Sequence, residues 1–358
     1  MRAGWYALAL VLSLGIVALV LYSTGTFDQW SDDRSLDQAC DGTLSQDGLD
    51  AALRSSSLSA DSEGDGDHLA ACRVRNAKTG AQAGAVELTL RWSSATPSSG
   101  ELSWYNKDYN GVRAQAVPLG NGWSGIARRQ GAWQVMVALD CVNEKKKALV
   151  AYGDLTGTAN NATLTGLARV TTETAQNAAE KHGCQVKPGK RLTEVSTSRL
   201  GTPDTATPLD QAQGSCTALR KLAPTAARNG APEAMEYPAD AHTPQVNCYL
   251  ATPDKKPGYG LYAYYGAAAE DFLASEGDNL KKGYGPTHSD KDYSWATAQC
   301  PQSTQPAVFV LYHLLDGDTD TYPIAHHSAE FATSALSTFA GHEAQVRGCA
   351  DVHMGSVP

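Results

Sequence analysis

The residues best suited to chemistry gather at the start of the last predicted helix, where His326, His327 and Glu330 follow one another closely. On a helix, His327 and Glu330 share one face, and an imidazole and a carboxylate placed in this way can bind zinc. The plainer alternative is a first helical turn in which the dipole favours glutamate and both imidazoles are exposed. This cluster supports an exported metal-dependent hydrolase as an alternative to a binding function.

A second group of candidates consists of tyrosines on two predicted neighbouring strands in the second half of the chain. They are Tyr249, Tyr259, Tyr262 and Tyr264. Exposed tyrosines on a sheet provide rigid amphipathic contact area, which suits the recognition of a peptide or a glycan. Tyrosine is also an ordinary strand residue, so a packed face of the sheet is the other interpretation.

The chain contains eight cysteines, and their spacing organises it. An even number of cysteines in an exported chain indicates disulfides, and the close C-x2-C pairs of a metal site are missing from the sequence. Several pairings are open within each half. We expect the sequential pairs Cys40–Cys72, Cys141–Cys184, Cys216–Cys248 and Cys300–Cys349.

The cysteine spacing also indicates a tandem duplication. The separation of Cys40 and Cys72 recurs between Cys216 and Cys248, and the tetrapeptide Leu-Asp-Gln-Ala precedes the first cysteine of each half. Ala148 and Ala307 follow the next cysteine of their halves at equal distances. Each half closes with a helix that ends in Gly-Cys, where glycine suits the left-handed position after a helix. We therefore predict domains at 35–190 and 208–358, joined by a linker at 191–207 that is rich in Ser, Thr, Gly and Pro.

Hydrophobic periodicity predicts the same order of elements in both halves. Val86 to Trp92 and Trp133 to Leu139 alternate apolar with polar residues, as half-buried strands do. A strand at 148–152 follows, and then apolar residues recur at helical spacing from Leu164 to His182. Strands that are adjacent in sequence and flanked by helices predict an α+β fold, with an antiparallel sheet packed with helices in each domain.

An uncharged apolar run from Trp5 to Tyr22 is long enough to cross a hydrocarbon core of about 30 Å. Arg2 precedes this run and Asp28 follows it, so the positive-inside rule places the N-terminus in the cytoplasm and the bulk of the chain outside. A cleaved signal peptide is the alternative, but its apolar region is usually shorter and ends at a small-residue cleavage site. We expect residues 1–24 to form a transmembrane signal anchor that contacts the lipid bilayer through residues 5–22.

The overall composition limits the partners. An apolar content of 42% supports packed cores, and a net charge of −9 disfavours nucleic acid as a partner. The sequence has no phosphate-binding G-x-x-x-x-G-K-[ST] motif, no G-x-G-x-x-G before a helix and no G-x-S-x-G. We expect no cofactor.

Three short motifs carry a resemblance to a known type of protein: Cys40-Asp41-Gly42, Cys72-Arg73-Val74 and the closing helix with its Gly-Cys end. With these motifs the chain resembles uncharacterised membrane-anchored envelope proteins of Streptomyces-type actinobacteria. It is more distantly similar to the PsbP/Mog1-like domains of actinobacterial lipoproteins, which are α/β/α sandwiches, but it lacks the lipid-attachment cysteine. The resemblance implies no catalytic residues.

These observations together predict a single-pass protein of the plasma membrane whose two homologous, disulfide-bridged domains lie outside the cell. We expect it to act in binding or assembly without catalysis of its own. An envelope protein or a glycan is the expected partner, since two similar domains on one anchor favour multivalent binding.

Overall fold

The computed structural model describes residues 26–63, 68–93, 115–130, 132–145, 147–157, 160–198, 206–282, 293–301, 303–316 and 319–355. The predicted anchor at 5–22 lies outside these residues. Among the helices that are described, none combines the length and the apolar character needed to cross a membrane.

The described residues form two antiparallel sheets of seven strands each. The first sheet has the order β1-β2-β3-β7-β6-β5-β4 and the second the order β14-β12-β13-β11-β10-β9-β8. The strands of the first sheet are β1 (Leu58–Glu63), β2 (Ala70–Asn76), β3 (Gly80–Trp92), β4 (Gln115–Pro118), β5 (Gly125–Gln130), β6 (Ala132–Asp140) and β7 (Ala148–Thr156). Those of the second are β8 (Thr207–Pro208), β9 (Glu233–Glu236), β10 (Gln245–Ala251), β11 (Pro257–Tyr264), β12 (Tyr293–Gln299), β13 (Pro306–His313) and β14 (His353–Met354).

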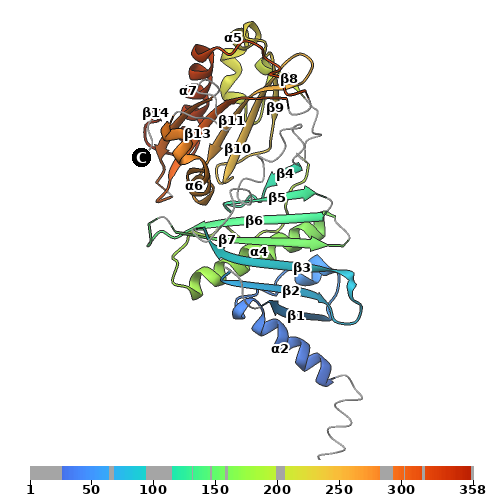
Figure 1. The fold of residues 1–358 in the computed structure, drawn as a ribbon. Helices are drawn as coiled ribbons and strands as arrows, with labels where there is room; N and C mark the ends of the chain where they lie inside the picture. Colours follow the sequence, from blue (N-terminus) through green and yellow to red (C-terminus); the bar gives the residue numbers. More distant parts are fainter. Residues whose placement is uncertain are drawn as a thin grey trace, which may run out of the picture.

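Helices pack on the sheets, as the α+β prediction requires. They are α2 (Thr26–Gly42), α3 (Leu49–Leu53), α4 (Asn161–Lys181), α5 (Ala223–Arg228), α6 (Ala267–Lys282) and α7 (Ala329–Val346), and short 3-10 turns η2 (Leu209–Gln211) and η3 (Thr217–Leu222) precede α5. The first sheet with α2, α3 and α4 is called the first unit, and the second sheet with α5, α6 and α7 the second unit. In Figure 1 the two units lie one above the other, with α2 at the end far from the second unit.

Local sequence explains where the two closing helices begin. The Asn160 side chain accepts the backbone N–H of Thr163, and the Thr163 hydroxyl in turn accepts the backbone N–H of Asn160, which forms a capping box for α4. Ser328 caps α7 in a similar way by accepting the N–H of Phe331. The long helix α6 was not predicted from the sequence.

Strand register shows that the two units share one framework of five strands. The order β1-β2-β3-β7-β6 in the first sheet corresponds to β9-β10-β11-β13-β12 in the second. One row of paired residues runs Ser62, Cys72, Leu88, Gly153, Val135 across the first sheet. The matching row runs Glu236, Cys248, Leu261, Leu311, Ser294 across the second sheet.

The disulfides occupy equivalent places in the two frameworks, and each bridge joins two cysteines of the same unit. Their pairing is the sequential one: Cys40–Cys72, Cys141–Cys184, Cys216–Cys248 and Cys300–Cys349. The first bridge of each unit ties the segment before the sheet to the second framework strand. The second bridge ties the end of a strand to the end of the closing helix, which holds α4 and α7 on their sheets.

The strand register also corrects one correspondence between the two halves that was predicted from residue spacing alone. Ala148 and Ala307 are equally distant from their cysteines, but Ala307 faces the core under α7 while Ala148 faces away from α4. Leu149 is the residue that faces α4, so it is the counterpart of Ala307. The strand connection therefore differs by one residue between the units, and a shift of one residue reverses the face of a strand.

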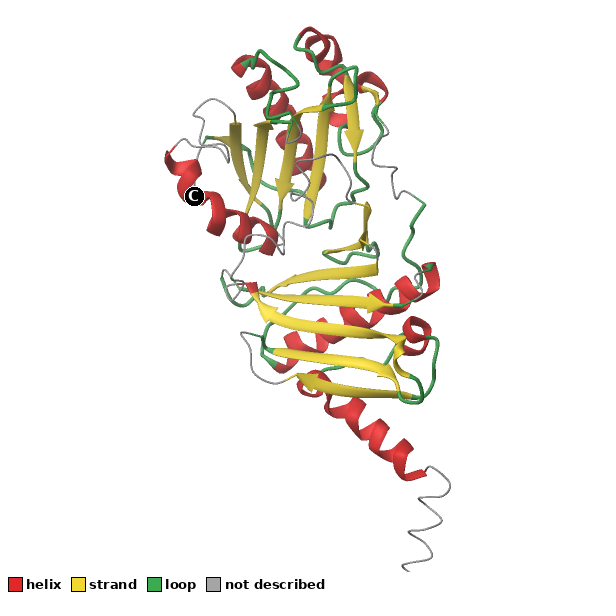
Figure 2. Cartoon of the chain, turned by 45° about the vertical axis from the view of Figure 1, so that its right-hand side comes forward, coloured by secondary structure: helices red, strands yellow, loops and turns green. Residues whose placement is uncertain are grey.

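Three apolar cores result from this arrangement. One lies between the first sheet and α4, and another lies between the second sheet and α7. The third includes residues of both sheets, such as Met136, Val150 and Val310, together with Phe272 of α6. Figure 2 shows the two sheets following one another along the molecule. The units are therefore joined by apolar packing as well as by the connecting chain.

Candidate functional site

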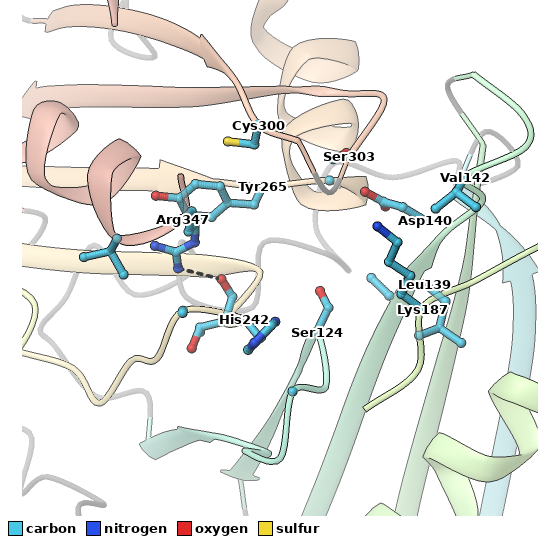
Figure 3. Close-up of a pocket in the computed structure, with 16 residues that line it drawn as sticks. Ser124, Leu139, Asp140, Val142, Lys187, His242, Tyr265, Cys300, Ser303 and Arg347 are labelled. Carbon is cyan, nitrogen blue, oxygen red and sulfur yellow. Dashed lines mark hydrogen bonds between the residues drawn. The ribbon is translucent and has the colours of Figure 1, made fainter. Parts of the chain in front are cut away.

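A cavity of about 190 Å³ lies where the two units meet. The first unit contributes the residues just before β5, the end of β6 and the segment after Cys184. The second unit contributes the loop before β10, the end of β11, the turn after β12 and the end of α7. Because Val142 and Cys300 both line the cavity, it lies beside the second disulfide of each unit (Figure 3).

Asp140, the last residue of β6, forms one wall of the cavity and joins the two units. Its carboxylate accepts hydrogen bonds from the Ser303 hydroxyl and from the backbone N–H of Ala267, the first residue of α6. The first unit thus caps a helix of the second unit. Gly266 makes room for this contact, because a Cβ there would lie 2.7 Å from Asp140 Oδ2.

Burial raises the pKa of Asp140 to about 6, and the negative charge of Glu270 contributes in the same direction. The hydrogen bonds from Ser303 and Ala267 act against the shift because they favour the charged form. An aspartate with this pKa binds or releases a proton close to neutral pH.

Tyr265, Glu343 and Arg347 form a second, fully connected group beside the cavity. Arg347 Nη1 lies 2.6 Å from Glu343 Oε2, and the side chains of both residues are 8% exposed. The Tyr265 hydroxyl donates to the same carboxylate at 3.2 Å, and the guanidinium stacks 3.7 Å from the centre of the Tyr265 ring. Burial raises the pKa of Tyr265 well above its ordinary value.

The same guanidinium positions the loop that carries His242. Arg347 Nη2 donates to the carbonyl oxygens of Asp240 and Thr243, at 3.0 and 3.2 Å. Within the loop, the backbone N–H of His242 donates to Asp240 Oδ1 at 2.8 Å. These contacts place the half-buried His242 on the cavity wall, and Figure 3 shows Ser124 close to it on the side of the first unit.

Exposed apolar side chains also line the cavity. Three large apolar side chains are prominently exposed in the described part of the chain: Val142 at 45%, Val346 at 46% and Met354 at 40%. Two of them, Val142 and Val346, line this cavity, one from each unit, as does the exposed Lys187. The lining therefore combines apolar side chains with a few polar groups, which is typical of a ligand site.

The three predicted metal ligands have different surroundings in the structure. His326 and Glu330 are exposed, whereas the half-buried His327 packs against His313, with ring centres 5.1 Å apart, and against Tyr259 at 5.9 Å. In the described ranges, no three His, Cys, Asp or Glu side chains form a group that could hold a metal ion. The metal hypothesis for these three residues stays a prediction.

The predicted tyrosine surface is packed instead of exposed. Tyr249, Tyr262 and Tyr264 lie on the face of the second sheet that belongs to the third core, and each is less than 9% exposed. Tyr264 stacks on Phe272 of α6 at 4.4 Å. Tyr259 lies on the opposite face, fully buried beside Phe331 of α7.

Sequence reasoning missed the cavity, since Ser124, Asp140, Lys187, His242 and Ser303 come from five separate segments and form no motif. One signal was available: Asp140 directly precedes a bridged cysteine, and the two second disulfides mark equivalent ends of the units. No family model, curated protein or solved structure matches this chain.

Proposed function

We propose that this chain is an extracytoplasmic, membrane-anchored binding protein of the cell envelope, built from two homologous domains and without catalysis of its own. Its binding site is the cavity between the two units. The envelope partner or ligand contacts the polar groups of the lining with one part and the exposed residues Val142 and Val346 with another.

The observation that carries this proposal is the composition of the cavity, whose lining includes polar groups from both units and two exposed valines. A concave site that offers both polar groups and exposed apolar side chains suits a ligand with a polar and an apolar part. Each unit supplies one valine, so the site requires both units.

Three further features support an exported protein with duplicated domains. The four disulfides suit an oxidising compartment. The apolar run at 5–22 suits a membrane anchor that precedes them. The shared strand order and the matching rows of paired residues suit descent of the two units from one ancestral domain.

Photo-cross-linking in intact producing cells tests the location of the site. A benzophenone amino acid replaces Val142, Val346 or Met354 in the full-length chain, and the adducts are identified by mass spectrometry after irradiation. We expect the same adduct from positions 142 and 346. Met354 is the matched control, since it is similarly exposed but lies on β14 outside the cavity.

The proposal is wrong if positions 142 and 346 give no adduct in cells that contain correctly bridged protein. It is also wrong if position 354 gives the same adduct in the same yield, because the contact would then not depend on the cavity.

A further inference from the structure

The polar groups around the cavity divide into those already satisfied by the protein and those still available. Arg347 is occupied by Glu343 and two carbonyl oxygens, and the Tyr265 hydroxyl is occupied by Glu343. Ser303 donates to Asp140. These groups shape the cavity, but none of them is available to a ligand without breaking a contact.

The available groups are hydrogen-bond donors. They are the exposed ammonium of Lys187, the imidazole of His242 and the hydroxyl of Ser124, which all line the cavity. For none of these three side chains does the structure give a side-chain hydrogen bond or ion pair within the described ranges. In Figure 3 they lie around the same space, with Lys187 on the side of Asp140 and His242 beside Ser124. Lys187 can only donate, and the hydroxyl of Ser124 and the imidazole of His242 can each donate as well, so the three groups together suit an anion.

Asp140 is the one feature that opposes an anion. Its carboxylate lines the cavity and is held in place by Ser303 and the start of α6, so it cannot turn away. The other charged or titratable side chains that line the cavity are Lys187, His242 and the paired Arg347, and Glu270 faces Asp140 from α6. Its pKa of about 6 means that protonation at neutral pH costs little.

We infer that the cavity binds an anionic group, such as a sulfate, phosphate or carboxylate, between Lys187, His242 and Ser124, and that Asp140 takes up one proton from solvent as the anion enters. The inference rests on the proposed function, because it names the chemical class of the ligand in the same cavity. Protonation removes a like charge from the wall, so binding and proton uptake favour each other.

Sulfate is the probe that tests the inference, since its charge is constant between pH 5 and pH 8. Isothermal titration calorimetry with the full-length protein, in an uncharged detergent, measures the affinity at pH 5.5 and pH 7.5. The same titrations at pH 6.5 in buffers of different ionisation enthalpy count the protons taken up. We expect tighter binding at pH 5.5 and an uptake of up to one proton per sulfate at pH 6.5.

Single substitutions test the roles of Lys187 and Asp140 in anion binding. Lys187→Ala should weaken sulfate binding on the order of tenfold or more, as expected for the loss of a charge-assisted hydrogen bond. Lys190→Ala is the control, because Lys190 is an exposed lysine on the same segment that does not line the cavity. Asp140→Asn should tighten binding at pH 7.5 by roughly tenfold and reduce the proton uptake measured at pH 6.5. Asparagine also caps helices, so α6 should keep its start.

Hexyl sulfate shows whether the physiological anion is free or attached to an apolar group. A gain in affinity over sulfate that is lost in Val142→Ser indicates an amphiphilic anion such as a lipid headgroup. Equal affinities indicate a free anion.

The inference would be overturned by equal loss of sulfate binding in Lys190→Ala and Lys187→Ala, or by proton uptake that is unchanged in Asp140→Asn. Absence of sulfate binding at both pH values would also overturn it. In that case adducts from positions 142 and 346 would still support the proposed function, with a ligand of another class. Absence of both adducts and sulfate binding would reject both proposals.

Discussion

The two units share a framework but use it differently at one equivalent place. In the first unit, the Trp92 ring at the end of β3 contacts His182, the residue that ends α4, in an edge-to-face arrangement at 6.0 Å. In the second unit, Tyr265 follows β11 and stacks against Arg347, the residue that ends α7. Both units thus place an aromatic ring beside a basic residue that ends the closing helix.

The two units differ four residues before this basic residue on their closing helices. Glu343 precedes Arg347 in the second unit, whereas Ala178 precedes His182 in the first. The glutamate allows Arg347 to be buried and to hold the loop at 240–243, while the partly exposed Trp92 contacts Lys147 at 4.2 Å. One added carboxylate therefore converts a surface contact into a buried network that positions a loop of the cavity. Substitutions in either unit and changes of pH test this comparison.

Removal of the second disulfide should have the largest effect and should be similar in the two units. The bridges close loops of 43 and 49 residues, so replacing either cysteine pair by alanine should lower the free energy of unfolding by about 4 kcal/mol. Urea unfolding of the full-length protein measures both losses. A difference of more than about 1 kcal/mol between the two variants would show that the units are not equivalent in stability.

Glu343→Ala gives the second unit the residue of the first and should cost about 3 kcal/mol, because it leaves the Arg347 charge buried without its partner. His182→Ala in the first unit should cost less than about 1 kcal/mol, since its aromatic contact is partly exposed. The same unfolding experiment compares them.

The double variant Glu343→Ala with Arg347→His restores the pattern of the first unit and removes the permanent charge. We expect it to be more stable than Glu343→Ala alone. Additive losses would contradict the buried-charge explanation.

Two helix glycines should respond in opposite directions. A Cβ on Gly166 of α4 would lie 2.6 Å from the backbone nitrogen of Ala52 in α3, so Gly166→Ala should destabilise by about 2 kcal/mol. Gly341 of α7 has open space around it, so Gly341→Ala should stabilise by about 1 kcal/mol through helix propensity. Thermal unfolding shows both shifts. Stabilisation by Gly166→Ala would mean that α3 does not contact α4 as closely as described.

A separate effect on stability should come from pH. Burial raises the pKa of Asp140 and of Asp271 to about 6, above the ordinary aspartate value of the unfolded chain. The folded state therefore binds these protons more tightly than the unfolded state does. Their contribution to stability is complete below the unfolded pKa and is lost as the pH rises from about 4 to 6.

Asp140→Gln places in the first unit the residue type of Gln299, its counterpart beside Cys300. We expect it to flatten the decrease in stability over this pH range by up to about 3 kcal/mol, since one unit of pKa corresponds to about 1.4 kcal/mol. Chemical unfolding at a series of pH values measures the slope. An unchanged slope would place the proton binding elsewhere.

The sequence contained a sign that the sheets are also buried on the face away from the closing helices. Val135 to Leu139 and Ala307 to Tyr312 are continuous apolar runs instead of strict alternations. Such runs indicate strands that are buried on both faces. They therefore predict that other residues pack on the face of the sheet away from the closing helix. The tyrosines of the second sheet belong to this second face, which explains why they are packed.

The sequence by itself determined the local and covalent features: the two sets of cysteines, the alternating strands, the α+β class and the closing helices. These depend on short-range periodicity, capping and spacing, which neighbouring residues encode. Only the tertiary structure decided the one-residue difference in register, the position of α6 and the cavity that joins Asp140, Lys187 and His242. The reason is physical: those contacts depend on how two apolar sheet faces and a helix pack together, and packing between distant segments leaves no fixed spacing in the chain.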